Sequence, residues 1–253
     1  MVGKAELKEL LKKIKSSEDI EALKPEIKEK LRGISPADLA FAEQELLEDG
    51  ISVDEIRRLC GPHLELLQEE IEKEPQALDA EHPIQILKSE HDVILKKLEE
   101  LNEVINKANG AKDYKQISGE FIKLSDVAHH LLEAESHHKR EEDVLFPELE
   151  ERGVTGPPMV MRAEHEDLRT RKKALKELVD TYSKIIYRDF VSKLNEIGGY
   201  LVQNLNDHIN KENNILYPTA LGAIDGGKWS EIKKKFDEIG YCCFTPGQVY
   251  EHD

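Results

Sequence analysis

The segment HHKREEDVLFP at residues 137–147 returns, with the same pattern, as HINKENNILYP at residues 208–218. Each copy begins with His, carries Glu four residues later, and ends with an apolar residue, Leu, an aromatic residue and Pro. Side chains four residues apart lie one above the other on one face of an α-helix. The repeat therefore predicts two equivalent helices that each present an imidazole and a carboxylate on the same side.

A further histidine precedes each copy on an apolar helical stripe. His91 and His165 stand three or four residues from Leu, Ile and Met side chains, which is the spacing of a core-facing helix stripe. His91 precedes His137 by 46 residues, and His165 precedes His208 by 43. These similar separations indicate a duplicated helical hairpin, so that four antiparallel helices form one bundle.

The polar residues on these stripes form a set that suits metal ions. Buried carboxylates are costly unless a cation neutralises them. Four imidazoles and two bridging carboxylates are too many for one tetrahedral zinc, whereas two six-coordinate iron or manganese ions would use them all and keep a position open. The candidate ligands are His91, His137, Glu141, His165, His208 and Glu212. The alternative is a metal-free polar network in an adaptor bundle.

The choice of ligands within the first copy stays open. Periodicity allows His138 with Glu142 to face the core in place of His137 with Glu141, and only the internal repeat favours the latter pair. His138 and His130 are also candidates for an additional ligand.

Other charged residues near the stripes have simpler expected roles. Glu90 and Glu164 each precede a candidate ligand histidine, so they are candidates for orienting an imidazole. The run Lys172, Lys173 and Lys176 is expected on the solvated face of its helix.

Residues 82–222 resemble the hemerythrin-like HHE cation-binding domain, whose mark is a repeated His…His-x-x-x-Glu-Glu followed by Leu-Phe-Pro. The resemblance implies an up-down-up-down four-helix bundle in which the six candidate ligands hold two iron ions. It also implies a protein that binds or senses O2, NO, peroxide or redox state. A di-iron enzyme or repair protein acting on NO, peroxide or damaged iron centres is the alternative. The chain departs from the motif at Glu212-Asn213, where the motif often has a second Glu. The oxygen carriers of the family use five His, whereas the internal repeat of this chain identifies only four.

The spacing of apolar residues and helix breakers predicts an all-α chain. Long helices are expected at about residues 83–108, 113–151, 157–182 and 187–221, with a last helix at 229–239. Shorter helices are expected before Pro75, one of them capped by Ser35 and another opened by a capping box of Ser52 and Glu55. The expected domains are residues 1–78, 82–222 and 223–253.

The N-terminal region, about residues 5–78, resembles the family called domain of unknown function 438. The similarity lies in EQELL at residues 43–47, in Gly50-Ile51 and in EIRRLCGPH at residues 55–63. That family commonly precedes hemerythrin-like domains, and a sensory PAS domain often follows. The resemblance therefore implies a sensory role and a signalling protein as partner. Cys60-x-x-His63 is either a weak metal motif or a helix-terminal Cys next to an exposed His.

Charge and composition narrow the possible partners and setting. The chain of 253 residues has 36 Lys and Arg against 52 Asp and Glu, a net charge of −16 that disfavours nucleic acid and anionic membranes as partners. Its 3 Cys do not make a disulfide framework, which favours a reduced, cytoplasmic setting. No apolar run approaches the roughly 18 residues of a membrane span.

Overall fold

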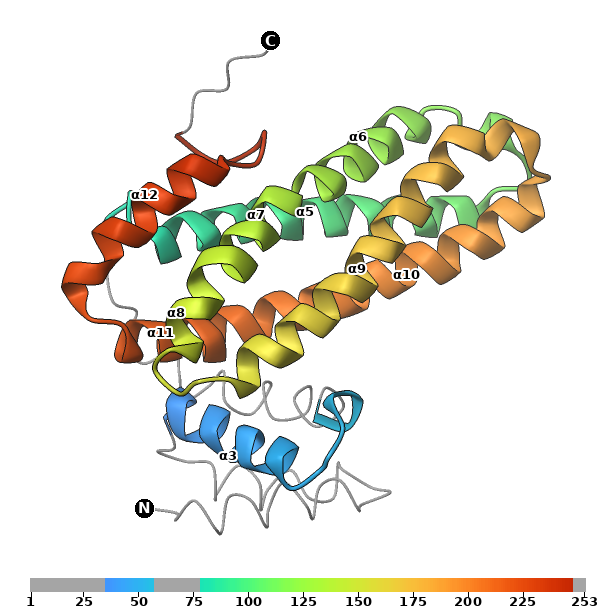
Figure 1. Ribbon diagram of the computed structural model, residues 1–253. Helices are drawn as coiled ribbons and strands as arrows, with labels where there is room; N and C mark the ends of the chain where they lie inside the picture. Colours follow the sequence, from blue (N-terminus) through green and yellow to red (C-terminus); the bar gives the residue numbers. More distant parts are fainter. Residues whose placement is uncertain (1–34, 57–77, 248–253) are drawn as a thin grey trace. The chain divides into compact units, whose positions relative to one another are not determined.

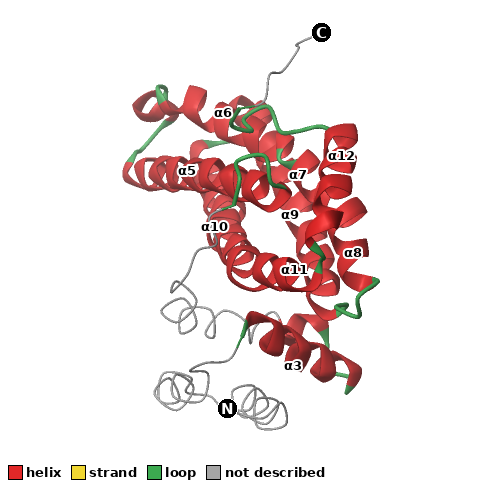
Figure 2. Ribbon diagram, turned by 90° about the vertical axis from the view of Figure 1, so that its left-hand side faces the viewer, coloured by secondary structure: helices red, strands yellow, loops and turns green. Residues whose placement is uncertain are grey.

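The computed structural model describes residues 35–56 and 78–247, and every regular element in these ranges is a helix (Figure 2). This confirms the all-α prediction. The helices expected before Ser35 and the Cys60-x-x-His63 motif lie outside the described residues. Among the helices that are described, none combines the length and the apolar character that crossing a membrane requires.

The chain divides into two compact units. We call the first the bundle unit; it comprises residues 80–141, 164–208 and 233–253. We call the second the N-terminal unit; it comprises residues 1–79, 142–163 and 209–232.

The bundle unit is built on four long helical segments that run side by side (Figure 1). They are α5 (Pro83–Gly110), the pair α6 (Glu120–Glu133) and α7 (Glu135–Arg140), and the parts of α9 (Gly156–Thr181) and α10 (Tyr187–Lys211) within this unit. The apolar stripes of these helices are buried, as the periodicity predicted. The predicted starts of α5 and α10 agree with the structure, and that of α9 agrees to within one residue.

Aromatic side chains close one end of the bundle. Tyr114, in the short 3-10 helix η1 (Tyr114–Ile117), donates its hydroxyl to the carbonyls of Tyr182 and Ile185 at 2.9 and 2.8 Å. Phe121 stacks on Tyr182 with ring centroids 3.8 Å apart. Tyr187 donates to the carbonyl of Ala108 at 2.7 Å. These contacts hold the α5–α6 connection against the α9–α10 connection, so that the hairpins cannot slide past each other.

The two repeat motifs interrupt the α-helical pattern in the same way. A π-helical turn follows α7 at Glu141–Leu145 (η2), and another follows α10 at Glu212–Leu216 (η4). The α-helical pattern then resumes in α8 (Phe146–Glu150) and α11 (Tyr217–Ala223). Proline at the second position of α8 and α11 lacks a backbone N–H, which favours a local change of hydrogen-bond register. Instead of one helix over 113–151, the chain forms five helical segments, which are η1 (Tyr114–Ile117), α6, α7, η2 and α8. Each π turn starts at the motif Glu.

The N-terminal unit contains α3 (Pro36–Glu48) and the segments around the π turns. The Ser35 side chain caps α3 by accepting from Asp38 N at 3.1 Å, as predicted. The predicted capping box is also present, since Ser52 N donates to Glu55 and Glu55 N donates to Ser52 Oγ. Helix α3 packs against η4 and α11.

A single side chain ties α3 to the start of α9 within this unit. The Gln44 amide oxygen accepts from Thr155 N at 2.9 Å and from Gly156 N at 3.2 Å, and its nitrogen donates to the Gly153 carbonyl. A Cβ at Gly156 would lie 2.8 Å from Gln44 Cβ. The close approach of α3 therefore requires glycine at this position.

The last described residues form α12 (Trp229–Ile239) and a short segment after it. We call residues 241–245 the C-terminal segment. It belongs to the bundle unit, where its side chains contact α5 and α7.

Candidate metal centre

Five of the six candidate ligands meet in the core of the bundle unit. His91 comes from α5, His137 from α7, Glu141 from the start of η2, His165 from α9 and His208 from α10. No more than 1% of the surface of any of them is exposed.

The sixth candidate, Glu212, follows His208 by one helical turn. It opens the π turn η4 and is fully buried. Relative to His208 it therefore holds the place that Glu141 holds relative to His137.

The four histidines form two pairs whose ring nitrogens face each other. His91 Nε2 lies 3.2 Å from His137 Nε2, and His165 Nε2 lies 3.0 Å from His208 Nε2. Each pair joins a helix of one hairpin to the other helix of the same hairpin, as the duplicated arrangement predicts. Two nitrogens that share one small space cannot both carry a proton, so at least one in each pair offers a lone pair.

Glu141 lies between the two histidine pairs. Its Oε2 atom is 3.5 Å from His137 Nε2 and also 3.5 Å from His165 Nε2. One carboxylate oxygen therefore reaches an imidazole of each hairpin, which is the placement that a bridging ligand needs.

Buried carboxylates orient one imidazole in each pair. His137 donates from Nδ1 to Glu90 at 2.7 Å, and His208 donates from Nδ1 to Glu164 at 2.8 Å. A hydrogen bond at Nδ1 fixes the tautomer and directs the Nε2 lone pair into the centre. The sequence predicted that these two Glu residues orient imidazoles. In the structure each of them accepts a hydrogen bond from the histidine on the neighbouring helix, not from the histidine next to it in the chain.

Glu90 is held by more than His137. Arg140 donates from Nη2 to both carboxylate oxygens at 2.6 and 2.7 Å, and Thr245 donates from its hydroxyl. Burial opposes ionisation of Glu90, yet the hydrogen bond to His137, the charges of His137 and Arg140 and the bond from Thr245 together lower its pKa to about 2. Glu90 is thus a carboxylate at neutral pH.

His138 is also buried, but it has different neighbours from His137. Its ring stacks on His165 with centroids 3.9 Å apart, and its Nε2 lies 3.4 Å from Lys172 Nζ. Burial and the nearby charges of His165 and Lys172 lower the pKa of His138 well below its usual value. His138, His165 and His208 offer ring nitrogens within 4.8 Å of one another, so a metal could also be reached from His138. Glu142, the partner proposed for it, is only half-buried.

Lys172 corrects one prediction. It was expected on a solvated face with Lys173, yet only 2% of its surface is exposed. The signal was present in the sequence, because Lys172 follows Leu168 by four residues and precedes Leu175 by three. Its position on the apolar stripe places it in the core.

Two other histidines have local roles in the structure. His130, a candidate additional ligand, is half-buried; its Nδ1 lies 2.8 Å from the Asp126 carbonyl oxygen and its ring lies beside Phe244. His82 accepts from Ile84 N and caps α5.

The sequence patterns do not point to the residues that the C-terminal segment brings to the site. Cys242 is fully buried, and its Sγ lies 3.2 Å from Ser136 Oγ. Burial and the charge of Glu90 raise the pKa of the Cys242 thiol to about 12, so it is a thiol at neutral pH. Its partners lie about a hundred residues away in the chain, and no periodic pattern links positions so far apart.

The donor set of the bundle unit fits metal ions. It provides paired imidazole nitrogens, a carboxylate between the pairs, and further carboxylates that fix the imidazoles, all shielded from water. Imidazole and carboxylate ligands suit iron or manganese, and hydrogen-bonded imidazoles are the usual accompaniment of a metal site.

Comparison with known proteins agrees with both resemblances. Residues 82–220 match the family described as the hemerythrin HHE cation binding domain, and residues 7–73 match the family of unknown function DUF438. The iron-sulfur cluster repair proteins YtfE of Salmonella paratyphi B and Salmonella newport are each 30% identical to the chain over 97 residues. The match covers 35% of this chain and 42% of each relative, so the chain spans less than half of their length.

Proposed function

Because the chain belongs to the hemerythrin family of HHE cation-binding domains, we propose that it is a non-haem di-iron protein that binds or senses O2 or NO. The observation that carries the proposal is the pairing of imidazole nitrogens at 3.2 and 3.0 Å, each pair oriented by a buried carboxylate. Two irons, or two manganese ions, would supply redox chemistry and an open coordination position for the small ligand, or for peroxide.

The proposed ligands follow the two pairs. His91 and His137 would hold one ion, and His165 and His208 would hold the other. Glu141 would be shared by both ions because its Oε2 lies 3.5 Å from an imidazole nitrogen of each pair, and Glu212 would join it by the internal repeat. His138 is left out of the set because Lys172, which can only donate, lies against its Nε2.

The residues around the ligands prepare the centre for a small ligand. Glu90 and Glu164 keep two imidazoles in the tautomer that points Nε2 inward. The apolar stripes exclude water, and Lys172 places a positive charge beside the histidines. These features favour a ligand that gains negative charge when it is bound and reduced.

Metal analysis tests the proposal directly. Protein purified without chelators or a nickel column should contain about two irons per chain by mass spectrometry, and its absorption spectrum in air should show near-ultraviolet oxo-to-iron bands. His91→Ala should lose most of the iron. His129→Ala is the matched control, because His129 is exposed on α6 and should leave the iron content unchanged. One zinc per chain, or no metal, would contradict the proposal.

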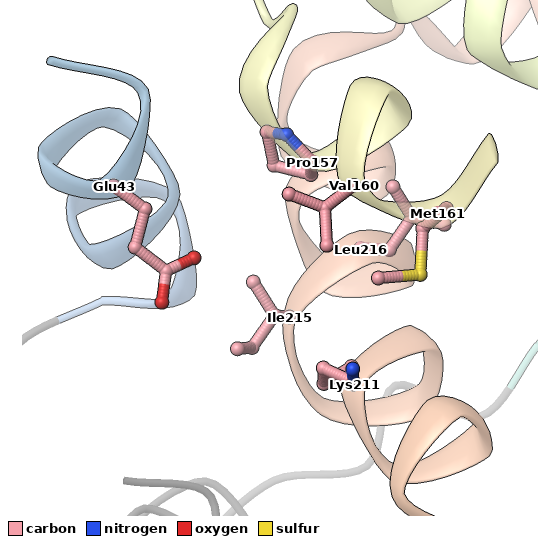
Figure 3. Close-up of a pocket in the computed structure, with 7 residues that line it drawn as sticks. All are labelled: Glu43, Pro157, Val160, Met161, Lys211, Ile215 and Leu216. Atoms are coloured by element: carbon pink, nitrogen blue, oxygen red, sulfur yellow. The ribbon is translucent and has the colours of Figure 1, made fainter. Parts of the chain in front are cut away.

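We further propose that the N-terminal helices carry the output to a signalling partner. Helix α3 packs on η4, the π turn that begins with the proposed ligand Glu212. A pocket between them is lined by Glu43 of α3 and by Lys211 and Ile215 (Figure 3). Hydrogen exchange of α3 amides should change when NO is added to the iron-loaded protein, and should not change in the metal-free protein.

A second candidate function is repair of damaged iron centres, or turnover of NO or peroxide. The similarity to iron-sulfur cluster repair proteins favours it. Consumption of NO or peroxide under reducing conditions, or restoration of a damaged iron–sulfur enzyme, would support this enzyme reading. Binding of NO or peroxide without turnover would support the function that we favour, which is a sensor in the reduced cytoplasm.

A further inference from the structure

The C-terminal segment reaches into the surroundings of the His91–His137 pair. Thr245, of which 3% is exposed, donates its hydroxyl to Glu90 Oε1 across 155 residues of sequence. Cys242 fills the space beside Ser136 on α7. The segment therefore contacts both helices that supply the first pair, α5 and α7.

Arg140 links this segment to Glu90. Its side chain is fully buried, its Nη2 donates to both oxygens of Glu90, and its Nε donates to the Ser136 carbonyl at 3.1 Å. The guanidinium lies over the ring of Tyr241 at 4.8 Å, a cation–π contact made by the C-terminal segment. Removing the segment would thus expose one face of Arg140 and take one donor from Glu90.

The network has a direct effect on one proposed ligand. Glu90 fixes His137 through Nδ1, and Arg140 and Thr245 fix Glu90. A carboxylate bound by three donors has little freedom to turn away from the imidazole. The same carboxylate with fewer donors would rotate, or admit water, and the direction of His137 Nε2 would be less well defined.

The sequence of the second copy does not repeat the residues that hold Glu90. Where the first copy has Arg140, the second has Lys211, which cannot form the same planar fork. The C-terminal segment occurs once in the chain, and its Thr245 hydroxyl donates to Glu90, not to the corresponding Glu164. Glu90 is therefore held by groups that the second copy does not repeat in kind.

We propose that the C-terminal segment is a structural part of the metal centre, with Thr245 and Arg140 acting as positioning residues that set the metal affinity of the His91–His137 half. This inference rests on the proposed di-metal function. It assigns to the segment after α12 a defined task, which is to help hold the carboxylate that orients His137.

The test compares Thr245→Val with Thr245→Ser in the full chain. Valine keeps the shape of threonine without the donor, whereas serine keeps the donor. In chelator competition with iron(II), Thr245→Val should weaken one of the two bound ions by about 10–100-fold, the range found when a partner of a ligating His is removed. Thr245→Ser should restore it. Thr170→Val, which removes an exposed hydroxyl on α9, should change neither ion.

A spectroscopic readout separates a positioning role from a loss of fold. Paramagnetic proton NMR of the cobalt(II)-loaded protein should show exchangeable imidazole N–H signals, and in Thr245→Val one of them should exchange faster with solvent. A chain that ends at Gly240 should show the same change more strongly. If the wild-type chain binds two irons and Thr245→Val binds them equally well with unchanged N–H signals, the inference is wrong and the proposed function stands. If the wild-type chain binds no metal, both are wrong.

Discussion

Glu90 accepts a hydrogen bond not from His91, its neighbour in the chain, but from Nδ1 of His137 on the facing helix, 2.7 Å away. Glu164 does the same for His208 at 2.8 Å. In each hairpin, one helix therefore supplies two groups. One is a candidate metal ligand, and the other is the carboxylate that orients the candidate ligand of the second helix. The hairpin, not the single helix, is therefore the unit that was duplicated.

Replacing either orienting carboxylate should weaken the metal centre without unfolding the bundle. Glu164→Gln keeps the size of the side chain, but its amide can present N–H to His208 Nδ1 and so favour the wrong tautomer. Iron affinity should fall by about 10–100-fold in chelator competition. Glu166→Gln, at an exposed position two residues away, is the control. Equal affinities in the two variants would show that Glu164 has no orienting role.

Adjacent histidines allow a sharp test of the ligand assignment. His137→Ala should remove most of the bound metal, because His137 Nε2 faces His91 and lies 3.5 Å from Glu141. His138→Ala should keep about two metals per chain, because His138 Nε2 faces Lys172. Metal content by mass spectrometry decides the matter. Retention in the first variant with loss in the second would reverse the assignment.

The buried amine of Lys172 predicts a preference for anionic ligands. In Lys172→Met the chain keeps its packing and loses the positive charge beside the histidines. Azide, followed through its charge-transfer band on the iron-loaded protein, should bind about tenfold more weakly, a change of about 1.4 kcal/mol. The iron content should be the same.

Lys173→Met provides the matched control, since Lys173 is exposed one residue further along the same helix. It should leave azide binding unaltered. An azide affinity in Lys172→Met equal to that of the wild type would exclude a role of this charge in ligand binding.

Periodicity explains how most residues of the candidate site follow from the sequence. His91 and His165 are candidates because their neighbours on the stripe are apolar, and the internal repeat favours His137 and Glu141 over the adjacent pair. For Lys172 the residue type and the position disagree, because lysine is rarely buried whereas its spacing places it on the apolar stripe. The structure follows the position.

Other features depend on contacts that no local pattern encodes. The Thr245–Glu90 hydrogen bond joins residues 155 apart, and Arg140 would be assigned to the surface on charge alone. The π turns at Glu141 and Glu212 arise where the helix accommodates a downstream proline, and a proline in the sequence does not by itself show which change of hydrogen-bond register follows. The domain limits 1–78, 82–222 and 223–253 stay predictions.

Alkaline pH should loosen the C-terminal segment through Tyr241. Burial and the hydrogen bond to Asp237 raise the pKa of Tyr241 from 10.0 to about 12. A raised pKa means that folding favours the neutral phenol, so this stabilisation is complete below pH 10 and is lost as the pH rises to about 12. The thermal unfolding midpoint should fall across that range.

The variant Tyr241→Phe separates this effect from that of other tyrosines. It should be less stable than the wild type near neutral pH, because it lacks the hydrogen bond to Asp237, and the difference should shrink between pH 10 and 12. A constant difference over this range would show that Tyr241 does not titrate with folding.

The packing of α3 should depend on glycine at position 156, because glycine has no side chain. A methyl group there would lie 2.8 Å from Gln44 Cβ and 3.0 Å from Gln44 Cα, and the backbone atom cannot move aside as a side-chain tip can. Gly156→Ala should therefore displace α3 at a cost of about 1–3 kcal/mol. Faster hydrogen exchange of the α3 amides, at unchanged iron content, would be the sign of this displacement.

The control for that variant is Gly222→Ala in α11, where a Cβ meets nothing within 4 Å. Alanine is favoured over glycine within a helix by about 0.5–1 kcal/mol, so this change should not speed exchange in α3. If Gly156→Ala behaves like Gly222→Ala, the contact between Gln44 and the start of α9 does not hold α3 in place. If it instead frees α3 and abolishes the NO-dependent change in its exchange, the Gln44 contact is part of the route by which the metal centre reaches the N-terminal helices.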